Sequence, residues 1–191
     1  MAGYTYSKTI DDASFDLEQP ANPYALAAER ALSLQDQRHR FTLSGLWVLG
    51  PDLDDPQDQA KASSSALMRV LTGLEVAPIF SAGSGFRANP ITGLDSNLEH
   101  VFPFAARPLR YGRNAPETAP NVDFDLRILK MVPIWRGHLD IVAESFNLLN
   151  HTNVSLLNTA YGVDRQSALG FGAPIAASTA RRIQFSLDFE Y

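Results

Sequence analysis

The sequence contains no cysteine, so it can form neither disulfides nor thiolate metal sites and has no cysteine nucleophile. Charged residues are also scarce, at 19% against about 25% in a typical soluble domain. Cations are not in excess, because the formal net charge is -5 and the sequence pI is near 5.3. Phosphate binding requires clustered Lys and Arg, so we expect no nucleic-acid partner.

Long apolar runs are absent as well. A membrane-spanning helix needs roughly 18 apolar residues, whereas the stretch Leu46 to Leu49 ends after a few. Helical spans are therefore excluded, but spanning strands are not. Residues Met1 to Lys8 show no basic region followed by an apolar one, so we expect no secretory signal peptide in this chain.

Alternation of polar and apolar residues is clearest from Arg182 to Tyr191. This period of two predicts a strand, and its length of roughly ten residues is typical of a membrane-spanning strand. A half-buried strand of a soluble sandwich would show the same alternation. Similar patterns predict further strands, which gives about six in all: Gly3 to Ile10, Arg40 to Leu49, Met68 to Phe80, Asn121 to Met131 and His138 to Asn147.

The connections between these strands alternate between long and shorter segments. The long ones lie near 11–37, 82–120 and 150–180. Outer-membrane barrels alternate short periplasmic turns with long extracellular loops, so these three are expected to face outward. Asn22 to Arg30 predicts a short helix in the first loop, and the Ala-rich stretch Gln57 to Leu71 could also be helical, which would shorten the third strand.

Five segments together resemble successive landmarks of TonB-dependent outer-membrane receptors of the subgroup with a carboxypeptidase-regulatory-like N-terminal domain. In order, they are Tyr4 to Ser14, Asp36 to Phe41, Phe124 to Lys130, Glu144 to Asn153 and Arg181 to Phe185. The resemblance implies that residues 1–191 are the C-terminal portion of a large barrel that encloses a plug and is driven by an inner-membrane energy-coupling complex. No segment resembles the signal peptide, the plug or the earlier barrel strands.

The expected fold is all-β: an antiparallel up-and-down transmembrane β-barrel fragment with long extracellular loops. About six strands are fewer than the eight of the smallest membrane barrels, so open edges would need partner strands. The expected location is the outer membrane. Expected partners are outer-membrane lipid, the remaining strands and plug of the parent receptor, the outer-membrane assembly machinery, and the TonB complex through the plug.

Polar faces of the predicted strands carry the plausible functional chemistry. Residues opposite the lipid-facing set point into the lumen of a barrel, where they pair with one another, contact a plug or line a substrate path. The lumen-facing candidates are Arg40, Asp123, Asp125, Arg127, Glu144, Arg182, Asp188 and Glu190. Phe189 and Tyr191 on the final strand resemble the aromatic signal that the assembly machinery recognises, and they could equally be interfacial anchors.

Catalysis is not expected, because no nucleophile and base pair is visible and no cofactor motif is present. Four histidines, His39, His100, His138 and His151, lie far apart without metal-binding spacing. A weak candidate for a hard cation is the alternating oxygen pattern of Asp95, Asn97 and Glu99, which lacks the glycine and distal glutamate of an EF-hand.

Two functions remain open from the sequence. The first is a fragment of a TonB-dependent active transporter, which contributes barrel wall and extracellular loops to substrate uptake. The alternative is a soluble β-rich binding or adhesion domain that uses its long loops as a contact surface.

Overall fold

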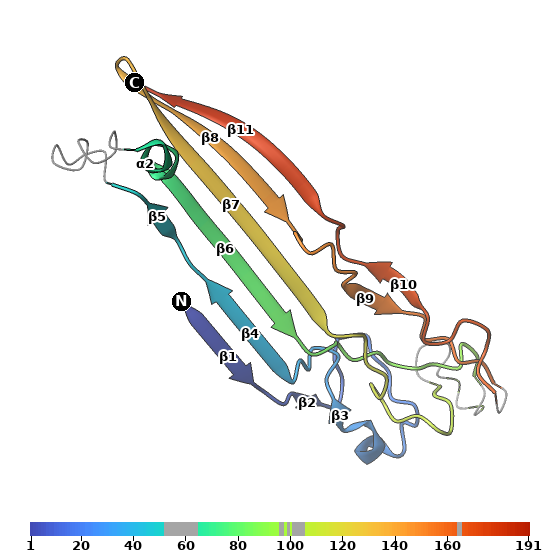
Figure 1. The fold of residues 1–191 in the computed structure, drawn as a ribbon. Helices are drawn as coiled ribbons and strands as arrows, with labels where there is room; N and C mark the ends of the chain where they lie inside the picture. The colour runs from blue at the N-terminus through green and yellow to red at the C-terminus, as the bar shows by residue number, and fades with distance from the viewer. Residues whose placement is uncertain (52–64, 96–97, 99, 101–105, 164–165) are drawn as a thin grey trace.

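A single curved antiparallel sheet forms most of the computed structural model, which describes residues 1–51, 65–95, 98, 100, 106–163 and 166–191. Its strands follow the order β1-β4-β6-β7-β8-β11, with β5 also paired to β6 (Figure 1). Every pairing in this sheet is antiparallel, and the strands lie across the sheet in the order in which the chain reaches them. The predicted all-β, up-and-down architecture is confirmed.

The strand bounds agree with the predicted segments, with corrections at several ends. They are β1 Ala2–Tyr6, β4 His39–Ser44, β5 Trp47–Leu49, β6 Leu74–Gly83, β7 Asn121–Ile134, β8 Gly137–Phe146 and β11 Arg182–Glu190. The first strand is shorter than predicted, because Ile10 belongs to a separate strand, β2 (Ile10–Asp11), that pairs with β3 (Ala31–Leu32).

The predicted strand Arg40 to Leu49 is interrupted between β4 and β5. Gly45 N donates to Pro78 O at 3.2 Å, so the carbonyl of Pro78 faces β4 and β5. In a strand, the backbone N–H of a residue points to the same side as its carbonyl, but proline has no backbone N–H. One bond of the ladder is therefore missing opposite Gly45, although the register is the same on both sides of the break.

The predicted start of the third strand, at Met68, is wrong. Met68 lies in the helix α2 (Ala66–Leu71), whose N-cap residue Ser65 accepts a hydrogen bond from Met68 N through its side chain. The Ser65 cap stabilises a helix where alternation predicted a strand. The strand β6 begins only after Gly73, which has a φ of +67°. The helical alternative is thus confirmed for the described end of Gln57 to Leu71, and 57–64 lie outside the described residues.

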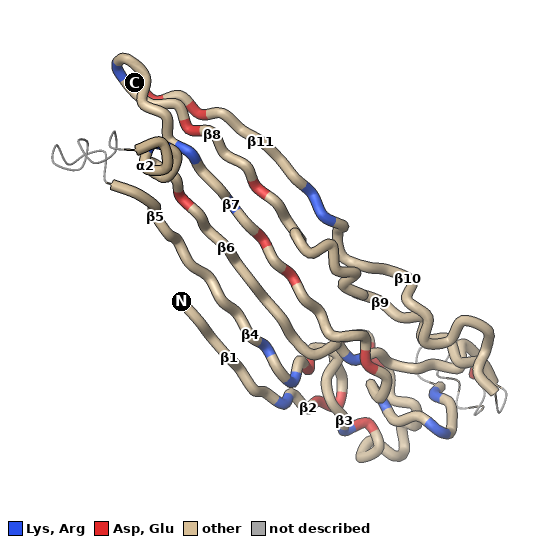
Figure 2. Tube along the Cα trace, in the orientation of Figure 1, with Lys and Arg blue, Asp and Glu red and all other residues tan. Residues whose placement is uncertain are grey.

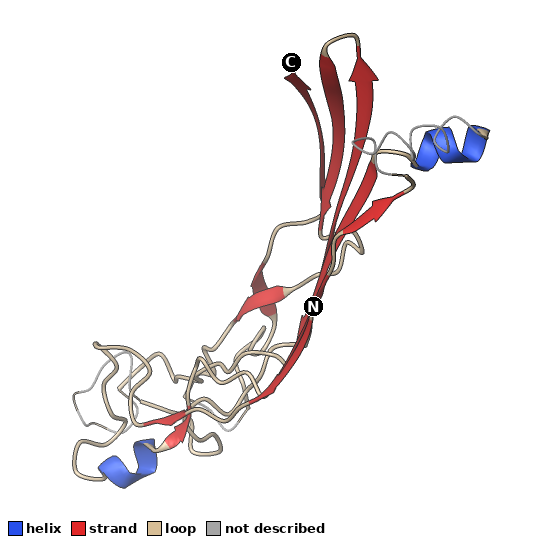
Figure 3. Ribbon diagram, turned by 90° about the vertical axis from the view of Figure 1, so that its left-hand side faces the viewer, coloured by secondary structure: helices blue, strands red, loops and turns tan. Residues whose placement is uncertain are grey.

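The described parts of all three long connections lie at one end of the sheet, as the alternation predicted (Figure 1). The opposite end carries α2 and the two-residue turn Trp135–Arg136. An edge-on view shows the sheet as one layer that continues into the loop cluster (Figure 3). We call the described parts of 7–38, 84–120 and 147–181 the loop cap. It contains β2, β3, the 3-10 helix η1 (Leu26–Glu29), β9 (Val154–Leu157) and β10 (Pro174–Ala177).

The helix predicted at Asn22 to Arg30 is present only as η1, a single 3-10 turn. Asn22 does not cap an α-helix; its side chain accepts a hydrogen bond from Tyr24 N at 2.8 Å and closes a local turn instead. Elsewhere in the described residues, no helix combines the length and apolar character needed to cross a membrane.

The landmark Glu144 to Asn153 ties the loop cap to the sheet. Asn147 N donates to Asp125 Oδ1 at 2.9 Å, and Leu148 N donates to Phe124 O at 2.7 Å. The Asn153 side chain then bonds both backbone groups of Val122 at 2.8 Å, as a neighbouring strand would. Positive φ angles at Asn147 and Asn150 permit the turn between these contacts.

Candidate lumen face and loop cap

The strand register brings all predicted lumen-facing residues to one face of the sheet. Residues directly opposite in a ladder share a face. Arg40 pairs with Gly83, which pairs with Asn121, two positions before Asp123 and four before Asp125. Arg127 pairs with Glu144, and Glu144 with Gln184. We call this side the polar face; Arg182, Asp188 and Glu190 belong to it by their positions in β11.

The opposite side, which we call the apolar face, is rich in exposed hydrophobic side chains. Phe185 is 79% exposed and Leu187 is 71% exposed. On the same face, aromatic rings form a row across β4, β6 and β7. The Phe80 centroid lies 6.1 Å from that of Phe41 and 6.3 Å from that of Phe124. Lys130 is an exception on this face, and its Nζ donates to three carbonyls at the C-terminal end of α2.

Charges on the polar face partly pair with one another. Arg127 lies 3.7 Å from Glu144, which also accepts a hydrogen bond from Gln184. At the end of the sheet, His138 lies 3.4 Å from Glu190. Figure 2 shows acidic and basic residues distributed along the strands, with a mixture of both signs in the loop cap. Two apolar side chains, Val142 and Phe146, interrupt the polar face on β8, and the Phe146 ring contacts the Arg182 guanidinium at 5.6 Å.

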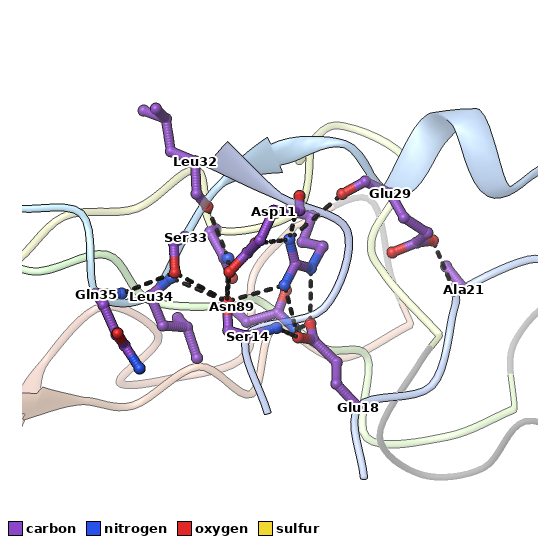
Figure 4. Close-up of polar contacts among 12 residues, drawn as sticks. Asp11, Ser14, Glu18, Ala21, Glu29, Leu32, Ser33, Leu34, Gln35 and Asn89 are labelled. Carbon is purple, nitrogen blue, oxygen red and sulfur yellow. Dashed lines mark hydrogen bonds and ion pairs between the residues drawn. The ribbon is translucent and has the colours of Figure 1, made fainter. Parts of the chain in front are cut away.

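A buried ion-pair network, which the sequence did not reveal, holds the loop cap together. The Arg113 side chain has no exposed surface and donates to both carboxylate oxygens of Glu18, at 2.8 and 2.6 Å. It also donates to Asp11 Oδ1 at 2.6 Å and to Ser14 Oγ at 2.9 Å. Its guanidinium therefore joins the second long loop to the first. Figure 4 shows its partners Asp11, Ser14 and Glu18 close together in the first long loop.

A second arginine extends this network. Arg107 forms a two-pronged pair with Glu29, at 2.9 and 2.5 Å, and donates to Asn89 Oδ1 at 3.3 Å. Asn89 in turn donates to Glu18 Oε1 at 3.2 Å, so the two ion pairs are linked. Paired guanidinium and carboxylate groups tolerate burial because each charge is hydrogen-bonded.

The Glu18 and Asp11 carboxylates are held in their charged form. Burial alone would raise the pKa of Glu18, but hydrogen bonds from Arg113 and from Ser14 N outweigh it and lower that pKa. For Asp11, burial is likewise outweighed, by hydrogen bonds from Ser33, Arg113 and Ser14, so its pKa is lowered too. The same contacts raise the pKa of Arg113. The ion pairs of Arg113 with Glu18 and Asp11 therefore stay ionised at neutral pH.

A hollow of about 450 Å³ lies on the polar face where the sheet meets the loop cap. Thr5, Arg40, Ser81 and Asn121 contribute from the strands, and Gln37 contributes from the first long loop. Gln37 Nε2 donates to Ser84 O at 3.1 Å and lies 2.9 Å from the Asn121 side-chain oxygen. Gly83 leaves room for this arrangement, because a Cβ there would approach Gln37 Nε2 to 2.4 Å.

Phe189 and Tyr191 lie together at the end of β11. Their rings are stacked with centroids 6.2 Å apart, and Tyr191 is 98% exposed. Gly137, at the start of β8, packs against this end so closely that a Cβ would meet Glu190 O at 1.8 Å. The aromatic pair thus lies at the end of the sheet opposite the loop cap, where the backbones of β8 and β11 pack closely.

The four histidines do not come together in one site. Each histidine has its own local contact: His39 with Tyr4, His100 with Asp95, His138 with Glu190 and His151 with Asn153. Asn97 and Glu99 of the cation candidate lie outside the described residues, and Asp95 accepts a hydrogen bond from His100 N at 2.8 Å. Within the described ranges, no group of three or more His, Asp or Glu residues could hold a metal ion.

Comparison with known proteins gives one finding. Residues 1–121 match a protein-family model described as an outer membrane beta barrel domain. No curated protein and no solved structure gives a significant match.

Proposed function

We propose a transport role from the premise that this chain belongs to the outer membrane beta barrel domain family, whose model matches residues 1–121. The chain is barrel wall in the outer membrane, where lipid surrounds it. Membership of this family also favours a membrane barrel over the alternative interpretation, a soluble binding or adhesion domain. Our proposal is that this wall belongs to a TonB-dependent active transporter.

The observation that supports the proposal most is the division of the sheet into two faces. All lumen candidates fall on the polar face, while the opposite face exposes Phe185, Leu187 and their apolar neighbours. A barrel wall needs this arrangement, because its outside contacts lipid and its inside contacts water or a plug. In the proposed orientation the loop cap is extracellular and the turn Trp135–Arg136 is periplasmic.

The sheet also offers edges for further barrel strands. Among the described strands, β1 pairs only with β4, and β11 pairs only with β8. Unpaired backbone groups at membrane depth are costly, so each edge requires another strand in lipid. The proposed partners are the remaining strands and plug of a larger receptor, through which the TonB complex would act.

Genetic interaction with energy coupling tests the transport proposal. Deleting the segment that encodes this chain is expected to slow growth on the transported nutrient, and loss of the energy-coupling complex is expected to slow growth on the same nutrient. Because both changes block one route, the double mutant should grow no more slowly than the coupling mutant alone. Growth is measured across a panel of nutrients. An additive defect, or one independent of energy coupling, would contradict the proposal.

A second expected result concerns the assembly machinery. Replacing both Phe189 and Tyr191 with serine should lower the amount of inserted protein several-fold, because the machinery grips aromatic side chains at the end of β11 in our proposal. Tyr24→Ser is the control, since Tyr24 is 97% exposed but lies in the loop cap. Immunoblots of outer-membrane fractions measure both variants. Equal abundance of the two would remove this role from the aromatic pair.

A further inference from the structure

The hollow between the sheet and the loop cap has a lining suited to hydrogen bonding. Thr5 and Ser81 provide hydroxyls, and Gln37 and Asn121 provide amides. Hydroxyls and amides can both donate and accept, which suits a ligand that carries many hydroxyl groups. Phe86 also lines the hollow, is 40% exposed, and offers a ring on which the apolar side of a sugar can lie.

Arg40 gives the hollow its charge. Of the described residues in the lining, it alone is ionic. Its neighbours across the ladder are Thr5 and Gly83, neither of which carries a charge. No ion pair of Arg40 occurs within the described part of the chain, in contrast to Arg107 and Arg113. The guanidinium is therefore available for a ligand.

The nearest loop carboxylate does not compete for this position. Asp36 lies one residue before Gln37, but its side chain is only 1% exposed. It accepts a hydrogen bond from Thr9 N at 2.8 Å and lies 3.4 and 3.8 Å from Arg38 and Arg87. These partners occupy the Asp36 carboxylate, which is not part of the lining, so Arg40 carries the only formal charge among the described lining residues.

We propose that this hollow binds an acidic saccharide, with its carboxylate on Arg40 and its hydroxyls on the surrounding amide and hydroxyl groups. Guanidinium and carboxylate form the strong two-pronged pairs found at recognition sites, and the volume of about 450 Å³ is that of a small-molecule site. The inference rests on the proposed function, because the hollow is open to solute only if the polar face lines the lumen.

Binding of a labelled uronic-acid disaccharide to outer-membrane vesicles tests the inference. Vesicles come from bacteria that carry the chain in its own membrane and from a strain that lacks it. We expect saturable binding that depends on the chain and weakens at least tenfold in Arg40→Gln. Arg136→Gln, in the turn at the other end of the sheet, should bind as the parent does. Immunoblots confirm equal amounts of each variant.

A second variant covers the case in which Arg40→Gln does not accumulate. Thr5 is exposed and pairs with Arg40 in the ladder, so the carboxylate of Thr5→Glu would neutralise the guanidinium and should cause the same loss of binding. A neutral disaccharide, which has hydroxyl groups but no carboxylate, serves as the comparison ligand and should bind at least tenfold more weakly than the uronic-acid disaccharide. Absence of chain-dependent binding, equal affinity for both sugars, or full binding in Thr5→Glu would each overturn the inference.

Failure of the inference can be told from failure of the proposed function. The chain has no cysteine, so a thiol at Ser186 is a unique label on its peptides. A small charged thiol reagent should modify Ser186→Cys on the polar face if that face lines the lumen. Modification without saccharide binding refutes only the ligand, whereas a Ser186→Cys thiol that stays unmodified refutes the lumen assignment on which the ligand depends.

Discussion

Replacing Arg113 with methionine is expected to destabilise the loop cap by about 3–5 kcal/mol. The Arg113 side chain has no exposed surface, and that of Glu18 is 2% exposed. Removing the cation would leave the Glu18 carboxylate buried without its main partner, which is the costly half of a broken ion pair. Hydrogen exchange of loop-cap amides, followed by mass spectrometry on membrane-embedded protein, measures the loss.

Arg110→Met is the matched control for this result. Arg110 lies in the same loop and is exposed, so the same change in side chain should leave exchange nearly unaltered. A further variant, Arg113→Met with Glu18→Leu, removes both charges and should recover part of the loss, because no unpaired carboxylate remains at that position. Equal exchange in Arg113→Met and Arg110→Met would show that the network does not hold the cap.

The importance of this network could not have been predicted from the sequence. Arg113 is separated from Glu18 by 95 positions and from Asp11 by 102. Neither loop has a hydrophobic period, and each residue type is common on exposed surfaces. Only the topology, which gathers the long connections at one end of the sheet, brings these charges together.

The two-faced sheet, by contrast, follows from local pattern alone. Alternation in β11 and β7 assigns each side chain to a face before any partner strand is known, and pairing preserves that assignment because opposite residues share a face. The errors lie where local chemistry overrides alternation. Ser65 caps α2 and delays β6, and Pro78 interrupts the pairing of β6 with β4 and β5.

The landmark Glu144 to Asn153 shows a third case, in which a motif was found but its role was not. Its asparagines could have suggested turns, since asparagine tolerates positive φ. What the sequence did not indicate is that Asn153 bonds both backbone groups of Val122, which extends the pairing of β7 beyond the end of β8. The motif thus fixes where the sheet ends and the loop cap begins.

Introducing arginine at Leu187 is expected to reduce the stability of the membrane-embedded barrel by about 2–4 kcal/mol if the position lies near the bilayer midplane. Leu187 is 71% exposed on the apolar face, and its ladder partner is Ile141. A guanidinium there would lose its hydration to lipid. Ser186→Arg is the matched control. Ser186 directly precedes Leu187 and lies on the polar face, opposite Val142, so an arginine side chain there should keep its hydration.

Urea titration of the two variants in lipid vesicles measures this difference, with folded and unfolded barrel separated by their mobility on gels. The experiment requires the complete barrel, because the edges of β1 and β11 need partner strands in lipid. A large cost at Leu187 with a small one at Ser186 would assign the apolar face to lipid and the polar face to the lumen. Equal costs would contradict that assignment, and a larger cost at Ser186 would reverse it. If the assignment were reversed, Arg40 and the hollow would face lipid and lose their access to solute, so this single comparison also tests the proposed route of the ligand.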